Sequence, residues 1–112
     1  MVKKKVVVFG GSGFIGSHVA DKLSELGFNT FIFDKLPSQW INKDQKMLVG
    51  DICDIEMVSK AVKGSDIVYN FAALADLNKA LYLPLESAKV NIMGNLNILE
   101  ACRLNKIKKF IY

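Results

Sequence analysis

The sequence predicts an α/β domain built on a parallel β-sheet, and three observations support this prediction. Short apolar segments alternate with amphipathic segments along the whole chain. The apolar segments are hydrophobic at nearly every position, which is typical of strands buried on both faces of a sheet. The connections between segments are short, which favours parallel strands joined by right-handed crossovers.

The composition fits one globular domain, because 51% of the 112 residues are hydrophobic and 23% are charged. The net charge is +4, and its lysine clusters at residues 3–5 and 106–109 each precede an apolar strand. No aromatic residues are interleaved with these lysines, so we do not expect a nucleic-acid partner. No segment approaches the roughly 20 apolar residues of a membrane span, so we do not expect a membrane partner.

A glycine-rich loop follows the first apolar strand, which we expect at residues 4–9. Gly10, Gly11, Gly13 and Gly16 satisfy two overlapping spacings, G-x-G-x-x-G and G-x-x-G-x-x-G. Glycine allows a tight turn, close approach of the backbone to a pyrophosphate, and close packing of helix on strand. The loop would leave its glycines at the mouth of the following helix, where unpaired N–H groups attract phosphate.

The glycine pattern is weak evidence alone, but the segments that follow supply its expected context. Apolar residues at near i, i+4 spacing predict a helix over residues 14–26, which Gly27 ends. A second strand at 29–34 ends in Asp34, whose carboxylate can accept both ribose hydroxyls of an adenosine. We therefore predict dinucleotide binding; the alternative is a glycine turn in a purely structural β-α-β unit.

The remaining elements continue the same alternation. A short strand is expected at 46–49, and Asp54 is a good N-cap for a helix that Gly64 would end. Strands at 66–70 and 108–112 enclose a helix at 85–104. The fold prediction is a Rossmann-type doubly wound parallel sheet of about five strands in the order 3-2-1-4-5, truncated after the fifth.

The helix at 85–104 is apolar over more of its circumference than one sheet contact requires. This breadth predicts a second partner surface. Asn91 lies within the helix, where it is either an ordinary polar position or a buried amide that positions backbone or water beside the site.

Five ordered motifs resemble the NAD-dependent epimerase/dehydratase family, the extended short-chain dehydrogenase/reductases that modify nucleotide sugars. The motifs are Val7–Gly16, Asp34, Gly50-Asp51-Ile52, Asn70-Phe71-Ala72-Ala73, and Val90–Cys102. The resemblance implies that residues 1–112 are an incomplete NAD-binding Rossmann domain, without the substrate and catalytic part. It also implies a cytoplasmic homodimer that pairs through the helix 85–104.

By this resemblance, the cofactor-binding residues fall into groups along the dinucleotide. Asp34 would hold the adenosine ribose, with Lys35 beside it, while Asp51 and the Ile52 backbone would contact the adenine. The pyrophosphate turn would be lined by Gly10, Gly13, Phe14, Ile15 and Gly16, and the nicotinamide side by Phe71, Ala72, Ala73 and the helix asparagine Asn91. For Asp51, a simple loop acid before a helix remains the alternative.

Charge favours NAD over NADP. A 2′-phosphate about 4 Å from the Asp34 carboxylate would be repelled by about 4 kcal/mol per charge pair at an effective dielectric near 20. Lys35 could offset part of this repulsion. We expect no metal, since Cys53 and Cys102 lack metal-ligand spacing and fit reduced thiols of a cytosolic protein.

Members of the family are similar in using a Tyr-x-x-x-Lys pair with an upstream Ser or Thr, and this pattern is missing. Ala73 and Glu86 stand four residues after Tyr69 and Tyr82, and Tyr112 is the last residue. We therefore expect no catalytic residue here and no turnover by this chain alone. We expect the parent enzyme to act on a nucleotide sugar by transient hydride transfer to NAD. The alternative is a non-catalytic NAD(P)-sensing module of the same superfamily.

Overall fold

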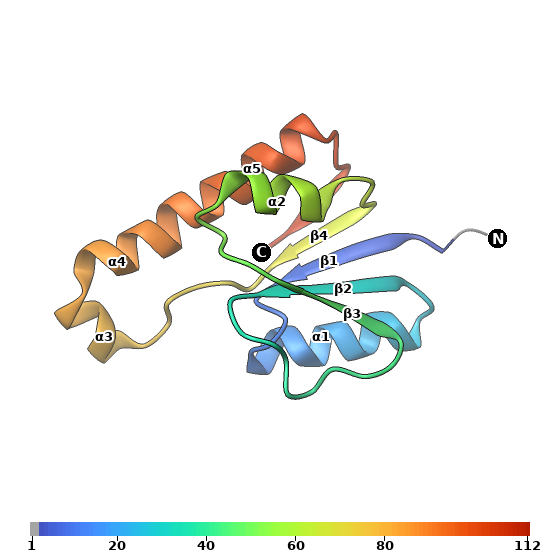
Figure 1. Ribbon diagram of the computed structural model, residues 1–112, viewed down its shortest axis with the longest axis horizontal. Coiled ribbons are helices and arrows are strands. Elements are labelled where there is room, and N and C mark those ends of the chain that lie inside the picture. The colour runs from blue at the N-terminus through green and yellow to red at the C-terminus, as the bar shows by residue number, and fades with distance from the viewer. Residues whose placement is uncertain (1–2) are drawn as a thin grey trace.

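The central strand of a five-stranded parallel sheet is β1 (Lys5–Phe9) in the computed structural model, which describes residues 3–112 (Figure 1). The order is β3-β2-β1-β4-β5, which confirms the predicted Rossmann-type topology. The other strands are β2 (Asn29–Asp34), β3 (Gln45–Val49), β4 (Ile67–Asn70) and β5 (Lys109–Ile111).

Strand β1 is buried on both faces because its side chains enter two separate cores. Val7 and Phe9 belong to one hydrophobic cluster, and Val6 and Val8 belong to the cluster on the opposite face. All four side chains are fully buried. A run of β-branched and aromatic residues with no polar face therefore fits only the middle of a covered sheet.

Helices cover both faces of the sheet (Figure 1). Helix α1 (Phe14–Glu25) packs on one face, while α2 (Ile55–Val62) and α5 (Asn95–Leu104) cover the other. The predicted N-cap of α2 is confirmed, because the Asp54 carboxylate accepts hydrogen bonds from the N–H groups of Glu56 and Met57.

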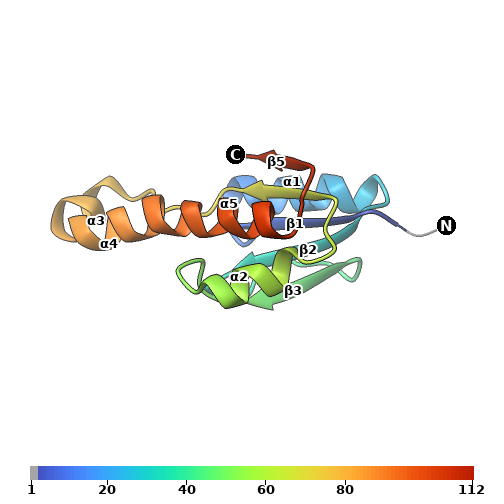
Figure 2. The same ribbon diagram turned by 90° about the horizontal axis from the view of Figure 1, so that it is seen from above.

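The helix predicted at 85–104 begins one residue earlier, at Pro84, and its hydrogen bonding is interrupted. It consists of α4 (Pro84–Ala88), the π-helical segment η1 (Lys89–Gly94) and α5. Its first half projects beyond the sheet (Figure 2). Just before it, α3 (Leu77–Tyr82) is capped by the Asp76 carboxylate. Within residues 3–112, no helix is long and apolar enough to cross a membrane.

The loop between β1 and α1 lies against the backbone that follows β4. Gly10 has φ +78°, and a Cβ atom there would stand 2.6 Å from both the Ala72 nitrogen and the Phe71 carbonyl carbon. Inside the loop, a Cβ at Gly16 would collide with the Gly10 carbonyl. These two glycines let three backbone segments meet at the carboxyl edge of the sheet.

Gly10→Ala and Gly13→Ala should therefore differ in stability. We expect Gly10→Ala to lower the free energy of unfolding by at least about 2 kcal/mol, through its positive φ and its backbone collision. Gly13 has φ −82°, and a Cβ atom there would have its nearest contact with the Gly10 carbonyl oxygen, at 3.4 Å. Gly13→Ala should cost about 1 kcal/mol or less in urea unfolding. Equal losses in both variants would contradict this account.

Candidate cofactor site

A cleft of about 280 Å³ opens at the carboxyl edge of the sheet, where open α/β sheets bind ligands. This volume is near the lower end of the usual range for small-molecule sites. Nine of the predicted residues line it: Gly10, Gly13, Asp34, Lys35, Asp51, Ile52, Phe71, Ala72 and Ala73. The carboxyl ends of β1, β2, β3 and β4 therefore contribute to one cavity.

The first turn of α1 begins at the edge of this cleft, at Gly13. Gly13 is its N-cap and supplies no side-chain hydrogen bond, and the first turn contains no acidic residue. Its early N–H groups are therefore available to a phosphate, with the positive end of the helix dipole behind them. The side chains of Phe14 and Ile15 are exposed and Gly16 is buried, and none of the three lines the cleft.

The Asp34 carboxylate joins the glycine loop to the end of β2. One oxygen accepts a hydrogen bond of 3.1 Å from the Ser12 N–H, and the other accepts one of 2.8 Å from the Lys35 N–H. Two backbone donors thus fix the carboxylate at the rim of the cleft. Each oxygen keeps acceptor capacity for a further donor such as a ribose hydroxyl.

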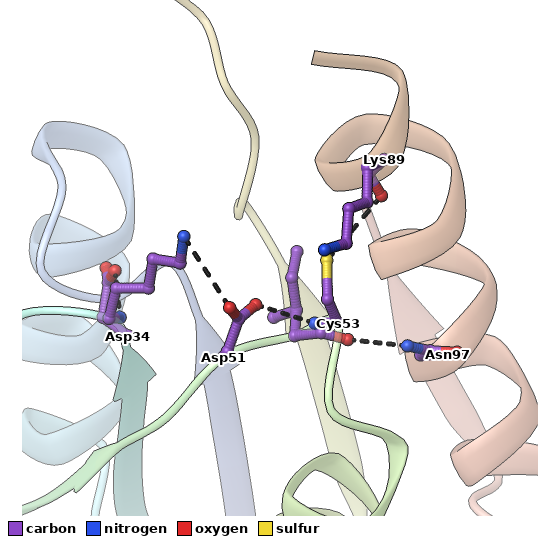
Figure 3. Close-up of polar contacts among 7 residues, drawn as sticks. Asp34, Asp51, Cys53, Lys89 and Asn97 are labelled. Carbon is purple, nitrogen blue, oxygen red and sulfur yellow. Dashed lines mark hydrogen bonds and ion pairs between the residues drawn. The ribbon is translucent and has the colours of Figure 1, made fainter. Parts of the chain in front are cut away.

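Asp51 also lines the cleft, in the turn between β3 and α2 (Figure 3). Its Oδ1 accepts a hydrogen bond of 2.9 Å from the Cys53 N–H, and its Oδ2 lies 3.7 Å from the Lys35 ammonium. The hydrogen bond from the Cys53 N–H is the main cause that lowers the pKa of the Asp51 carboxyl. Lys35 and Lys89 also lower this pKa, whereas burial raises it. The carboxylate is therefore charged at neutral pH and able to accept from an amino group.

Asn91 holds the loop after β4 rather than lining the cleft. Its side-chain oxygen accepts a hydrogen bond of 2.7 Å from the Leu74 N–H, and its amide nitrogen donates to the Leu74 carbonyl at 3.2 Å. The expectation of a buried amide was wrong, since Asn91 is exposed. Asn91 lies in η1, where its side chain contacts the Leu74 backbone on one side and solvent on the other.

Several residues that shape the cleft are not among the predicted site residues. Leu74, Glu86 and Val90 lie on its wall, together with Phe33 and Gly50. Two further helix asparagines hold the loops of the cleft. The Asn95 side-chain oxygen accepts a hydrogen bond from the Asn70 amide, and the Asn70 oxygen accepts one from the Ala72 N–H. The Asn97 amide donates a hydrogen bond to the Ile52 carbonyl. Asparagines at 91, 95 and 97 in one helix were a usable signal, since asparagine is a poor helix former.

The residues of the cleft suit a dinucleotide. Gly13 presents no side chain at the start of α1, and the charged residues Asp34, Lys35 and Asp51 line the cavity. Among the described residues, no group of three histidine, cysteine or acidic side chains could hold a metal ion. Cys53 and Cys102 are free thiols, and burial raises the pKa of Cys102 to about 11. His18 is exposed on α1, away from the cleft.

The chain is similar to known proteins along nearly its whole length. The model of the NAD dependent epimerase/dehydratase family matches residues 6–112. The chain is 32% identical to a putative UDP-glucose 4-epimerase of Methanocaldococcus jannaschii, over 96% of this chain and 36% of that protein. It is 34% identical to a 3-beta-hydroxysteroid dehydrogenase of Mycolicibacterium neoaurum, over 96% of this chain and 31% of that protein.

Among solved structures, UDP-glucose 4-epimerase of Thermus thermophilus in complex with NAD superposes with a TM-score of 0.88 and 31% identity. That match covers 96% of this chain and 36% of the epimerase. The chain thus spans about a third of the length of these relatives. Because the family match extends over nearly all of the sequence, the chain belongs to the NAD dependent epimerase/dehydratase family.

Proposed function

We propose that this chain is the NAD-binding part of an enzyme that epimerises or dehydrates a nucleotide sugar by transient hydride transfer. One observation carries the proposal: Gly13 at the N-cap of α1, Asp34 and Asp51 line one cleft. These three features suit, in turn, a pyrophosphate, a ribose and an adenine.

In this proposal each group has a separate task. The N–H groups at the start of α1 bind the pyrophosphate, and Gly10 and Gly13 allow it to approach the backbone. Asp34 accepts from the adenosine ribose, and Asp51 with the Ile52 backbone contacts the adenine. Phe71, Ala72 and Ala73 line the path toward the nicotinamide, which supplies a hydride acceptor when NAD is bound.

The nucleotide-sugar substrate is supported by the names of two similar proteins, a putative UDP-glucose 4-epimerase and the UDP-glucose 4-epimerase of Thermus thermophilus. We propose that these 112 residues do not contain the catalytic pair, because neither Tyr69 nor Tyr82 is followed by a lysine four positions later. We therefore propose that the chain binds NAD but does not convert a nucleotide sugar alone. If the parent protein lacks a Tyr-x-x-x-Lys pair, the non-catalytic NAD(P)-sensing module becomes the better description.

We also propose that the helix 84–104 pairs with a second copy of the chain. Ile98 and Ala101 are fully buried against the sheet, whereas the opposite flank is exposed. Four large apolar side chains make up that flank: Ile92, Met93, Leu96 and Leu99, with 58%, 52%, 49% and 40% of their surface exposed. A continuous apolar strip of this kind is typical of a helix-to-helix interface.

The role of Asp34 can be tested by titrating the purified chain with NAD and NADP in a calorimeter. We expect NAD to bind more tightly than NADP, since a 2′-phosphate would meet the Asp34 charge. Asp34→Ala should weaken NAD binding by about tenfold or more, as expected for the loss of hydrogen bonds to a charged group. The same substitution should also reduce the ratio of the NADP dissociation constant to the NAD dissociation constant.

Asp44→Ala is the matched control, because Asp44 is an exposed acid in the loop before β3. It should leave both dissociation constants unchanged. A normal NAD affinity in Asp34→Ala would remove Asp34 from the site. Absence of NAD binding by the unsubstituted chain would refute the proposed function itself.

The proposed pairing predicts a dimer in sedimentation experiments. Leu96→Glu should convert it to a monomer, because two desolvated carboxylates would face each other across the interface. Leu26→Glu serves as the control, since Leu26 is equally apolar and 63% exposed at the end of α1 on the other face of the sheet. Equal behaviour of the two variants would argue against pairing through this helix.

A further inference from the structure

One peptide group connects the Asp51 carboxylate to the helix α5. The carbonyl of Ile52 accepts a hydrogen bond of 2.9 Å from Asn97 Nδ2, and the N–H of Cys53 donates one of 2.9 Å to Asp51 Oδ1 (Figure 3). These two groups are opposite ends of the same planar peptide unit. Fixing the carbonyl end from the helix therefore also fixes the direction of the N–H at the other end.

The same helix also determines where the Ile52 side chain lies. Ile52 is 7% exposed, and its side chain occupies the space in which Gly94 would carry a Cβ atom. Gly94 and Asn97 are three residues apart, at the start of α5. Both the side chain and the carbonyl of Ile52 are thus held by one turn of helix, rather than by strand β3 alone.

From this geometry we infer that Asn97 is a positioning residue for the adenine end of the cofactor site. It holds the Ile52–Cys53 peptide group so that the Cys53 N–H points at the Asp51 carboxylate. The Ile52 backbone and the Asp51 side chain then face an adenine in a fixed arrangement. This inference rests on the proposed function, because it assumes that the cleft binds an adenine nucleotide.

The electrostatics of the turn agree with this role. Two hydrogen bonds in series through one peptide group polarise each other, so the bond from Asn97 strengthens the bond from Cys53 to Asp51. The Cys53 N–H is the largest cause of the lowered pKa of Asp51. The other charges that act on Asp51 are the ammonium groups of Lys35 and Lys89, and neither belongs to α5. A change at Asn97 should therefore reach Asp51 through the peptide group.

The first test is an NMR titration of the Asp51 side-chain carboxyl in the cofactor-free chain. In Asn97→Ala we expect the pKa of Asp51 to rise toward its ordinary value. The matched control is Asn105→Ala: Asn105 ends the same helix and is also part-buried, but it donates to Ser59 and to the Ala101 carbonyl. The control should leave the Asp51 titration unchanged.

The second test compares NAD with nicotinamide hypoxanthine dinucleotide, which lacks the 6-amino group of adenine. In Asn97→Ala, NAD should bind about tenfold more weakly, while the hypoxanthine analogue should change less. The affinity ratio between NAD and the hypoxanthine analogue should therefore become smaller. A merely structural role of Asn97 would weaken both ligands equally and would leave the Asp51 titration of the folded chain unchanged.

The outcomes separate the inference from the proposed function. An Asp51 pKa in Asn97→Ala equal to that of the unsubstituted chain would overturn the inference, whatever the ligands do. Failure of the unsubstituted chain to bind NAD would refute the proposed function, while the titration would still decide whether Asn97 acts on Asp51. If Asn97→Ala does not fold, Asn97→Leu keeps a side chain of similar shape without the donor, and the same expectations apply.

Discussion

The contact of the β1–α1 loop with the backbone after β4 is the constraint on which the rest of the site depends. β1 and β4 are hydrogen-bonded neighbours, so the segments that leave them emerge side by side. Gly10 lets these segments touch without a side chain between them, at a φ that glycine adopts readily. The result is an edge of the sheet where a ligand meets backbone N–H groups and the start of a helix.

Around this backbone floor, hydrogen bonds rather than apolar packing determine where the polar groups lie. Asp34 is held by N–H groups from its own strand end and from the glycine loop, and Asp51 is held by the turn that contains it. The asparagines of the long helix extend this pattern to the loops after β3 and β4. Half-buried polar groups that are held by several hydrogen bonds give a site one defined geometry.

The long helix has two surfaces with different tasks. One side supplies Ile98 and Ala101 to the core and its asparagines to the loops of the cleft, and the other exposes a strip of apolar side chains. The segment between α4 and α5 is π-helical, and Asn91 and Gly94 both belong to it. A π-helical turn contains more residues than an α-helical turn, which changes the side chains that face the loops. The irregular segment lies where the helix contacts the site.

The sequence alone determined the strand order, the boundaries of β2 and the acids at the rim, because buried strands, glycine spacing and helix caps are local patterns. Only the tertiary structure revealed α3 and the π-helical segment, since neither produces a hydrophobic period of its own. It also decided which of Asn91, Asn95 and Asn97 holds which loop, because those bonds join residues 17 to 45 positions apart. The tertiary structure also decided the exposure of Phe14, Ile15 and Asn91, because exposure depends on the surfaces that the packed elements leave uncovered.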